Sequence, residues 1–191
     1  MKRILFVCTG NTCRSPMAEG VFQMMANKEG LQLDIRSAGV VAVDQSPISP
    51  LADALLQEKG FRETISSNLL TAELVNWSDL ILTMTINHKQ HVTMQHPDAI
   101  GKVYTLKEYA RLSTKSDEQQ QEQAQAISEI QIKIALGKEL SVEERLVWDQ
   151  LQTTDDDIVD PFGGTVEDYR RSLEEIEHSL QSLMDKIKKL D

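Results

Sequence analysis

Short apolar runs alternate along this chain with longer amphipathic stretches. The apolar runs lie at residues 3–7, 31–35, 80–84 and 102–106, and each has the length of a β-strand. The run at 80–84 reads Leu-Ile-Leu-Thr-Met. Such a nearly continuous apolar run is typical of a central strand that is buried on both faces of a parallel sheet. The pattern therefore predicts four strands.

The stretches between these runs carry apolar residues at spacings of three and four, together with helix start and stop signals. Thr71 and Thr85 are expected to cap helices, and Ser49-Pro50 marks another helix start. Helices are predicted at residues 16–30, 50–60, 71–77, 86 onward and 166–190. The alternation implies an α/β fold, a doubly wound four-stranded parallel sheet with helices on both faces. Ligands of such sheets bind beyond the carboxyl ends of the strands.

Residues 110–157 depart from this alternation. A tract rich in glutamine and glutamate leads into a helix that ends at Gly137, and Ser141 with Glu144 forms a capping box that opens a second helix. We predict a single domain over residues 1–191 with a helical insertion at about 110–157. The insertion would be a lid, a docking surface or a neutral addition. A neutral addition is favoured because extra residues in a surface loop have only a small entropic cost.

The apolar stripe of residues 166–190 allows two interpretations. Its alternating spacings of three and four fit a coiled-coil seam. They also fit a terminal helix that lies on the sheet, which is the arrangement we expect.

The loop that follows the first strand has the composition of an anion site. Residues 8–15 read Cys-Thr-Gly-Asn-Thr-Cys-Arg-Ser and join the carboxyl end of a strand to the amino end of a helix. Backbone N–H groups are unpaired at such a helix start, and the peptide dipoles are positive there. Gly10 and Asn11 tolerate the left-handed angles that turn amides inward, and Arg14 adds a planar fork for two phosphate oxygens. We expect a phosphate to bind here.

Cys8 lies at the tip of the strand and faces the same point. The positive field favours its thiolate over its thiol, which makes it a candidate nucleophile. A lone cysteine would more simply be an inert buried residue. The combination of Gly10, Asn11, Arg14 and Ser15 at the required spacing favours the nucleophile instead.

Composition narrows the class of protein further. The net charge of −10 argues against a nucleic-acid partner, because phosphate backbones attract basic surfaces. The sequence shows no signal peptide and no run of transmembrane length, so we expect a cytoplasmic protein with no membrane partner. Its two cysteines are too few for a disulfide framework or a cysteine zinc site. His88 and His91 suggest a metal site, but we predict none, because no carboxylate follows at ligand spacing and exposed histidines are common on polar helices.

A Cys, five residues and then Arg-Ser, placed directly after an N-terminal strand, resembles the signature of the low-molecular-weight protein tyrosine phosphatases. The form Thr-Gly-Asn-Thr-Cys-Arg-Ser, together with Asp160-Pro-Phe-Gly-Gly at residues 160–164, is similar to the bacterial protein-arginine phosphatase branch. The resemblance implies a protein phosphatase that hydrolyses phosphoarginine through a cysteinyl-phosphate. The alternative is hydrolysis of phosphotyrosine. Residues 110–157 are longer than the link expected in such relatives.

The resemblance also assigns roles to residues. Cys8 would attack phosphorus, Arg14 and the loop amides would hold the equatorial oxygens, and Asp160 would protonate the leaving group and then activate water. Ser37 would brace the loop, although a plain turn serine explains it nearly as well. The expected substrate-binding residues are Thr9, Gly10, Asn11, Thr12, Cys13, Ser15 and Phe162.

Thr12 and Cys13 each have two interpretations. By the resemblance, Thr12 faces the pocket entrance, where its hydroxyl favours a guanidinium over an aromatic ring. It would otherwise be an incidental small residue that points away. Cys13 would either capture an oxidised Cys8 as a disulfide or merely pack on the inner side of the loop.

Two other classes of protein compete with a phosphatase. Arsenate reduction on the related scaffold passes oxidation to a further cysteine pair, and this chain has none. A phosphate-binding module needs neither Cys8 nor Asp160. We therefore expect an enzyme without a cofactor or metal that acts on phosphorylated proteins. We expect it to be a monomer, and the resemblance implies redox regulation and a place in bacterial stress responses.

Overall fold

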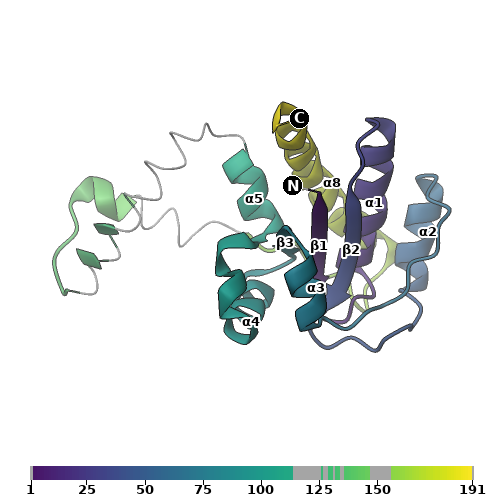
Figure 1. The fold of residues 1–191 in the computed structure, drawn as a ribbon, viewed down its shortest axis with the longest axis horizontal. Helices are drawn as coiled ribbons and strands as arrows, with labels where there is room; N and C mark the ends of the chain where they lie inside the picture. The colour runs from purple at the N-terminus through teal and green to yellow at the C-terminus, as the bar shows by residue number, and fades with distance from the viewer. Residues whose placement is uncertain are drawn as a thin grey trace. The chain divides into compact units, whose positions relative to one another are not determined.

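The computed structural model describes residues 2–113, 126, 129–130, 132–133, 136–146 and 156–190. Within these residues, four parallel strands form one sheet in the order β2-β1-β3-β4 (Figure 1). The strands are β1 (Arg3–Cys8), β2 (Asp34–Gly39), β3 (Leu80–Thr83) and β4 (Val103–Thr105). The predicted four-stranded parallel sheet is therefore confirmed.

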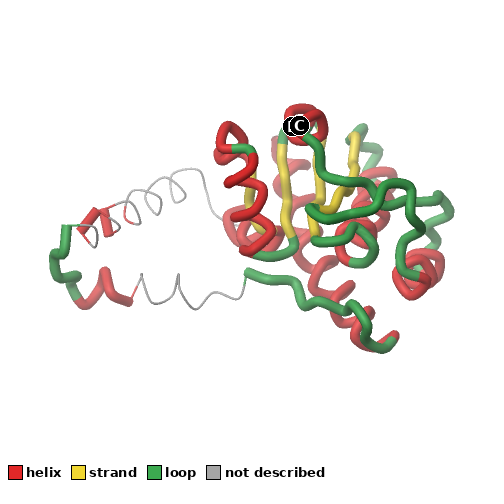
Figure 2. The backbone as a smooth tube through the Cα atoms, turned by 90° about the horizontal axis from the view of Figure 1, so that it is seen from below, coloured by secondary structure: helices red, strands yellow, loops and turns green. Residues whose placement is uncertain are grey.

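The alternating side chains of β1 belong to two hydrophobic cores, one on each face of the sheet. Ile4 and Phe6 lie in the larger core with α1 (Arg14–Lys28), α2 (Pro50–Glu58) and α8 (Val166–Leu190). Leu5 and Val7 lie in the smaller core, under α3 (Ala72–Trp77), α4 (Ile86–Gln95) and the 3-10 helix η1 (Pro97–Lys102). Helix α5 (Leu106–Ser113) follows β4. Figure 2 shows the strands, in yellow, surrounded by these helices.

The terminal helix α8 settles one of the open interpretations. Leu173, Ile176, Leu180, Leu183 and Ile187 are buried in the same core as Ile4 and Phe6. The apolar stripe therefore packs in the larger core of the sheet, as expected, and not in a coiled-coil seam.

The second strand begins later than the prediction at residues 31–35. Gly30 has a positive φ of 71°, and the amide of Leu31 donates back to the Ala26 carbonyl at 2.9 Å. These residues therefore complete the end of α1, and pairing with β1 starts only at Asp34, opposite Arg3. Leu31 and Leu33 still pack against the core, which explains their apolar pattern.

The predicted helix starts at Thr71, Thr85 and Ser49-Pro50 are all confirmed, and α2 begins at Pro50. Thr71 and Thr85 accept from the backbone amides of Leu74 and His88 at 3.3 and 3.2 Å. The Ser49 side chain makes no capping bond, because its hydroxyl donates to the Tyr169 hydroxyl at 2.9 Å.

The chain divides into two compact units, residues 1–111 with 156–191, and residues 112–155. In the smaller unit the predicted capping box is confirmed, since Glu144 accepts from the Ser141 amide at 2.9 Å and donates its own amide to the Ser141 hydroxyl at 3.2 Å. Most of the two helices predicted for this stretch lie outside the described residues. No described helix has the length and apolar character needed to cross a membrane.

Arg111 and Asp156 are the residues at which the larger unit ends and resumes. Their side chains form a two-pronged ion pair, with Arg111 Nη2 3.1 Å from Asp156 Oδ2 and Nη1 on the other oxygen. The chain therefore leaves and re-enters the larger unit at points that are held together.

Candidate active site

The loop at residues 8–15 is bent sharply between β1 and α1. Asn11 adopts the left-handed conformation, with φ of 52°. Gly39, at the end of β2, lets the loop approach closely, because a Cβ there would lie 2.5 Å from the Thr9 carbonyl oxygen and 2.7 Å from the Asn11 nitrogen. The neighbouring strand thus requires glycine at this position.

Asn11 holds the loop from behind. Its side chain is fully buried, and its amide nitrogen donates to the hydroxyls of Ser15 at 2.9 Å and Ser37 at 2.8 Å. Its amide oxygen accepts from the Asn68 backbone at 2.7 Å. These bonds satisfy the side chain on both ends and explain how a strained backbone angle persists.

The Cys8 thiol lies at the end of β1 and is 3% exposed. The Ser15 hydroxyl donates to its sulfur at 2.9 Å. This hydrogen bond fixes the position of the sulfur at the start of the loop, where a nucleophile is expected.

Glu19 extends this network and was missed by the sequence analysis. The Ser37 hydroxyl donates to Glu19 Oε2 at 2.5 Å, so hydrogen bonds run from Glu19 through Ser37, Asn11 and Ser15 to Cys8. Burial raises the pKa of Glu19 to about 7, although the bond from Ser37 lowers it. Its position four residues after Ser15 on the same helix was the available signal, because residues four apart share a helix face.

Glu19→Gln should make the protein more stable at alkaline pH. The pKa of Glu19 lies above the unfolded value of 4.5, so ionisation costs folding free energy as the pH rises from about 4.5 to about 7. We expect the advantage of the variant to grow by about 2 kcal/mol between about pH 5.5 and 8.5, as measured by urea unfolding. Glu167→Gln, which changes an exposed carboxylate, is the control. An advantage of Glu19→Gln that does not change with pH would contradict the prediction.

Arg14 is 4% exposed and joins the loop to the segment before α8. Its Nη2 donates to Asp160 Oδ2 at 2.7 Å and its Nη1 to the Ile158 carbonyl at 3.2 Å. Among the described residues, its Nε is the one buried side-chain nitrogen or oxygen without a hydrogen-bond partner. The guanidinium thus keeps one buried donor available beside the loop.

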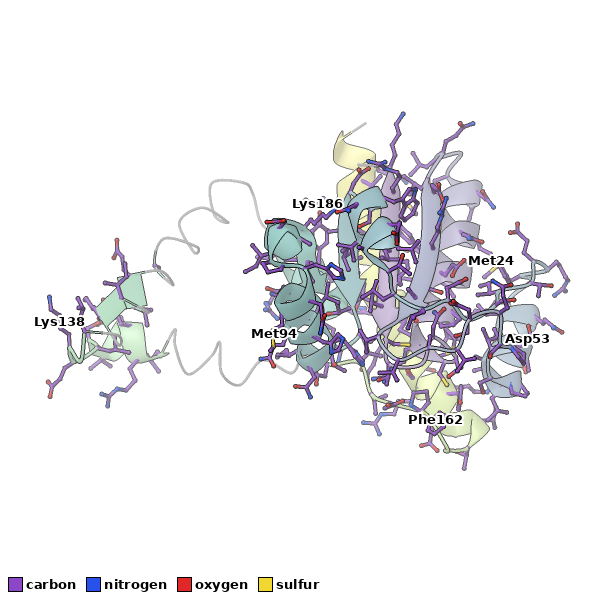
Figure 3. The ribbon with its side chains drawn as sticks, turned by 60° about the horizontal axis from the view of Figure 1, so that its bottom comes forward. Met24, Asp53, Met94, Lys138, Phe162 and Lys186 are labelled. Carbon is purple, nitrogen blue, oxygen red and sulfur yellow. The ribbon has the colours of Figure 1, made fainter. Side chains whose placement is uncertain are left out.

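Asp160 and Phe162 close the site from the other side. The Asp160 side chain is half exposed, and its Oδ1 accepts from the Phe162 amide at 3.2 Å. Phe162 is 78% exposed and projects from the loop before α8 (Figure 3). A cavity of about 210 Å³ is lined by Cys8, Thr9, Gly10, Thr12, Cys13, Arg14, Asp160 and Phe162.

The far end of the loop is held by α8 and the segment before α2. The Ser49 amide donates to the Thr12 carbonyl at 2.8 Å, and the Cys13 sulfur lies 3.1 Å from the Tyr169 hydroxyl. Burial is the main cause that raises the pKa of Tyr169, so this hydroxyl stays protonated at neutral pH. Cys13 is buried and free, which fits both a packing role and a redox role.

His88 corrects the expectation that the histidines of α4 are exposed. Its ring is 7% exposed, with Nε2 2.8 Å from the Thr9 hydroxyl and Nδ1 2.9 Å from the Thr85 hydroxyl. Burial, then the charge of Arg14, lowers the pKa of His88 to about 4. His91 is exposed as expected. No group of residues suited to a metal ion occurs in the described part of the chain.

Comparison with known proteins identifies the family of this chain. The sequence model of the family described as low molecular weight phosphotyrosine protein phosphatase matches residues 3–123. The chain belongs to the low molecular weight phosphotyrosine protein phosphatase family. The predicted resemblance is thereby confirmed, and the chain is a protein phosphatase.

Individual members of the phosphatase family match nearly the whole chain. A protein-arginine-phosphatase of Bacillus subtilis is 36% identical over 97% of both proteins. A low molecular weight protein-tyrosine-phosphatase PtpB of Staphylococcus haemolyticus is 32% identical over 91% of both. Among solved structures, a mutant of the YwlE arginine phosphatase with a phosphorylated active-site serine has a TM-score of 0.72 to this chain. Its sequence is 35% identical, and the match covers 98% of this chain and 96% of that one.

The structure brings most of the predicted site residues of this phosphatase to one cavity. Three others, Asn11, Ser15 and Ser37, lie behind the loop in the network that ends at Cys8. The residues that sequence reasoning missed, Glu19 and His88, also lie behind the loop.

Proposed function

We propose that this phosphatase hydrolyses phosphoarginine on proteins, with Cys8 as nucleophile, Arg14 as phosphate clamp and Asp160 as acid and base. The observation that carries the proposal is that all three side chains line one small cavity at the end of β1. The resemblance to a protein-arginine-phosphatase over 97% of the chain supports the choice of substrate.

The first step transfers the phosphoryl group to sulfur. The Cys8 thiolate attacks phosphorus, the P–N bond breaks, and Asp160 gives its proton to the departing guanidine nitrogen. Phosphate oxygens compete with Asp160 for the Arg14 guanidinium, and one of them can satisfy the buried Nε donor. Substrate binding therefore releases the carboxyl group that the step requires.

The second step hydrolyses the thiophosphate. Asp160, now a carboxylate, takes a proton from water as the water oxygen attacks phosphorus, and the S–P bond breaks to restore the Cys8 thiolate. Ser15 donates to the sulfur and so stabilises it as a leaving group. The products are inorganic phosphate and an enzyme with Asp160 protonated again.

Selection of phosphoarginine is assigned to Thr12 and Asp160. Thr12 lines the cavity with a hydroxyl, and the carboxyl group of Asp160 offers an acceptor oxygen to the planar guanidinium while it holds the proton for the leaving nitrogen. The exposed ring of Phe162 favours the alternative, phosphotyrosine, because it could stack on a phenyl ring. A side-by-side assay on phosphoarginine and phosphotyrosine peptides of one sequence decides between them, and a higher kcat/KM on phosphotyrosine would overturn the proposal.

Thr12→Ile should shift this preference. We expect kcat/KM on phosphoarginine peptides to fall about tenfold to a hundredfold, since one lost polar contact costs about 1 to 3 kcal/mol. The value on phosphotyrosine peptides should stay the same or rise, because an aliphatic wall suits an aromatic ring. Thr12→Ser keeps the hydroxyl and serves as the matched control. An unchanged ratio of the two activities in Thr12→Ile would remove Thr12 from the specificity argument.

The redox role of Cys13 is also a proposal. Peroxide oxidises the Cys8 thiolate to a sulfenic acid, and the Cys13 thiol condenses with it to a disulfide and water. We expect dithiothreitol to restore the peroxide-treated enzyme. The Cys13→Ala variant should lose its activity irreversibly, because peroxide over-oxidises Cys8 when no second thiol can form the disulfide. Equal recovery of the two proteins, measured as p-nitrophenyl phosphate turnover, would leave Cys13 as a packing residue.

Location and assembly complete the proposal. Two free cysteines on one loop suit a reducing compartment, so we place the enzyme in the cytoplasm. The protein is proposed to act as a monomer, which sedimentation analysis tests directly.

A further inference from the structure

A histidine side chain bridges the catalytic loop to the neighbouring strand. His88 is in the first turn of α4, just after β3. Its ring nitrogens contact the hydroxyl of Thr9, which follows the nucleophile, at 2.8 Å and that of Thr85, the helix cap, at 2.9 Å. Because β3 pairs with β1, the bridge joins the ends of two adjacent strands.

The protonation state of this histidine determines how many of its two hydrogen bonds the ring donates. Burial and the charge of Arg14 keep the ring neutral at neutral pH, and a neutral imidazole has one donor and one acceptor. One threonine hydroxyl therefore donates to the ring and the other accepts from it. Both polar atoms of a nearly buried side chain are thus used, so the ring does not simply fill space.

Thr9 borders two cavities. It lines the 210 Å³ cavity of Cys8 and a cavity of about 520 Å³ on the α4 side, which also contains His88. Arg14 and Asp160 line both. The Thr9 carbonyl accepts from the Val41 amide at 2.9 Å, so its backbone is held from the β2 side and its side chain from the β3 side.

We propose that His88 is a positioning residue of the phosphatase reaction, which holds Thr9, and with it the Cys8 end of the loop, in the geometry that the transition state requires. The inference rests on the proposed cysteinyl-phosphate mechanism but not on the choice of substrate. A loop that shifts by about 1 Å misplaces both nucleophile and amides, and such displacement can cost a hundredfold in rate. The loss should fall on kcat more than on KM, because a misplaced loop weakens binding of the transition state more than binding of the substrate.

The test compares variants that break the bridge from either side. His88→Leu and Thr9→Val each remove it, whereas His88→Gln keeps one donor and one acceptor in an amide. With p-nitrophenyl phosphate, we expect His88→Leu and Thr9→Val to lower kcat about tenfold to a hundredfold with KM changed less than about threefold. His88→Gln should recover most of this loss. His91→Ala, which changes an exposed histidine one turn along α4, is the matched control.

The double variant His88→Leu/Thr9→Val decides whether the two residues act as a unit. Its kcat should equal that of the more damaged single variant, because the bridge can be lost only once. Independent multiplication of the two losses would overturn the proposal, as would a kcat within threefold of the wild type in Thr9→Val. A loss in His88→Leu that tracks its melting temperature and that His88→Gln does not rescue would leave His88 as a packing residue.

Two further outcomes keep this test separate from the proposed function. If His88→Leu does not fold, Thr9→Val and His88→Gln still measure the bridge. Cys8→Ser is assayed in parallel. Full turnover in that variant would refute the mechanism itself, whereas an inactive Cys8→Ser beside a fully active Thr9→Val would refute only the role of His88.

Discussion

Cys8→Ser is expected to lower the turnover of p-nitrophenyl phosphate by at least about a thousandfold. A serine hydroxyl is not ionised near neutral pH, and the bond that Ser15 donates at 2.9 Å does not suffice to ionise it. Binding of inorganic phosphate, measured by calorimetry, should change by less than about threefold. The loop amides and Arg14 that hold the anion do not depend on the chemistry of sulfur.

Intact-mass analysis separates this explanation from simple misfolding. A small fraction of Cys8→Ser should retain a phosphate after long incubation with substrate, because a serine alkoxide is a poorer leaving group than a thiolate. Ser15→Ala keeps the thiol and provides a comparison, and it should retain measurable turnover. Activity near the wild-type rate in Cys8→Ser would refute Cys8 as the nucleophile.

Asp160→Asn is expected to slow poor leaving groups about a hundredfold to ten-thousandfold and good leaving groups much less. An amide cannot supply the proton that a poor leaving group needs. The measurement is kcat/KM across a series of aryl phosphates whose leaving groups differ in pKa. The slope of its logarithm against leaving-group pKa should become steeper in the variant.

The ion pair of Asp160 with Arg14 adds an independent readout. Because Asp160 Oδ2 lies 2.7 Å from the guanidinium, it competes with phosphate oxygens for the same donor. Asp160→Asn should therefore bind inorganic phosphate severalfold more tightly while it turns over more slowly. Equal losses across the leaving-group series would instead assign Asp160 a structural role.

The local signals in the sequence were strong enough to predict the sheet and the place of the loop between β1 and α1. Strand β3 is buried throughout and begins with three apolar residues, and the spacing from Cys8 to Arg14 is a short-range pattern that depends on a single turn. Asp160 was predicted only through the family resemblance, because 146 positions separate it from Arg14. The start of β2 was misjudged because Leu31 and Leu33 are apolar for packing, and apolar alternation alone does not report which residues pair.

The contacts behind the loop could not be read from the sequence. Thr9 and His88 are 79 positions apart, and they meet only because β3 lies beside β1 in the sheet. The expectation of exposed histidines followed from the polar composition of α4. Polar composition does not identify which residue of a helix turns toward a neighbouring strand, so the buried ring was missed.

The ion pair of Arg111 with Asp156 has a consequence for how this protein can change over generations. The segment that follows it is tied down before it reaches Asp160: Asp157 accepts from the Ile86 amide at 2.7 Å, and the Ile158 amide donates to the Met84 carbonyl at 2.8 Å. Residues gained or lost between positions 112 and 155 should therefore leave the position of Asp160 almost unchanged. Selection can therefore rework that stretch for another purpose with little effect on the position of Asp160.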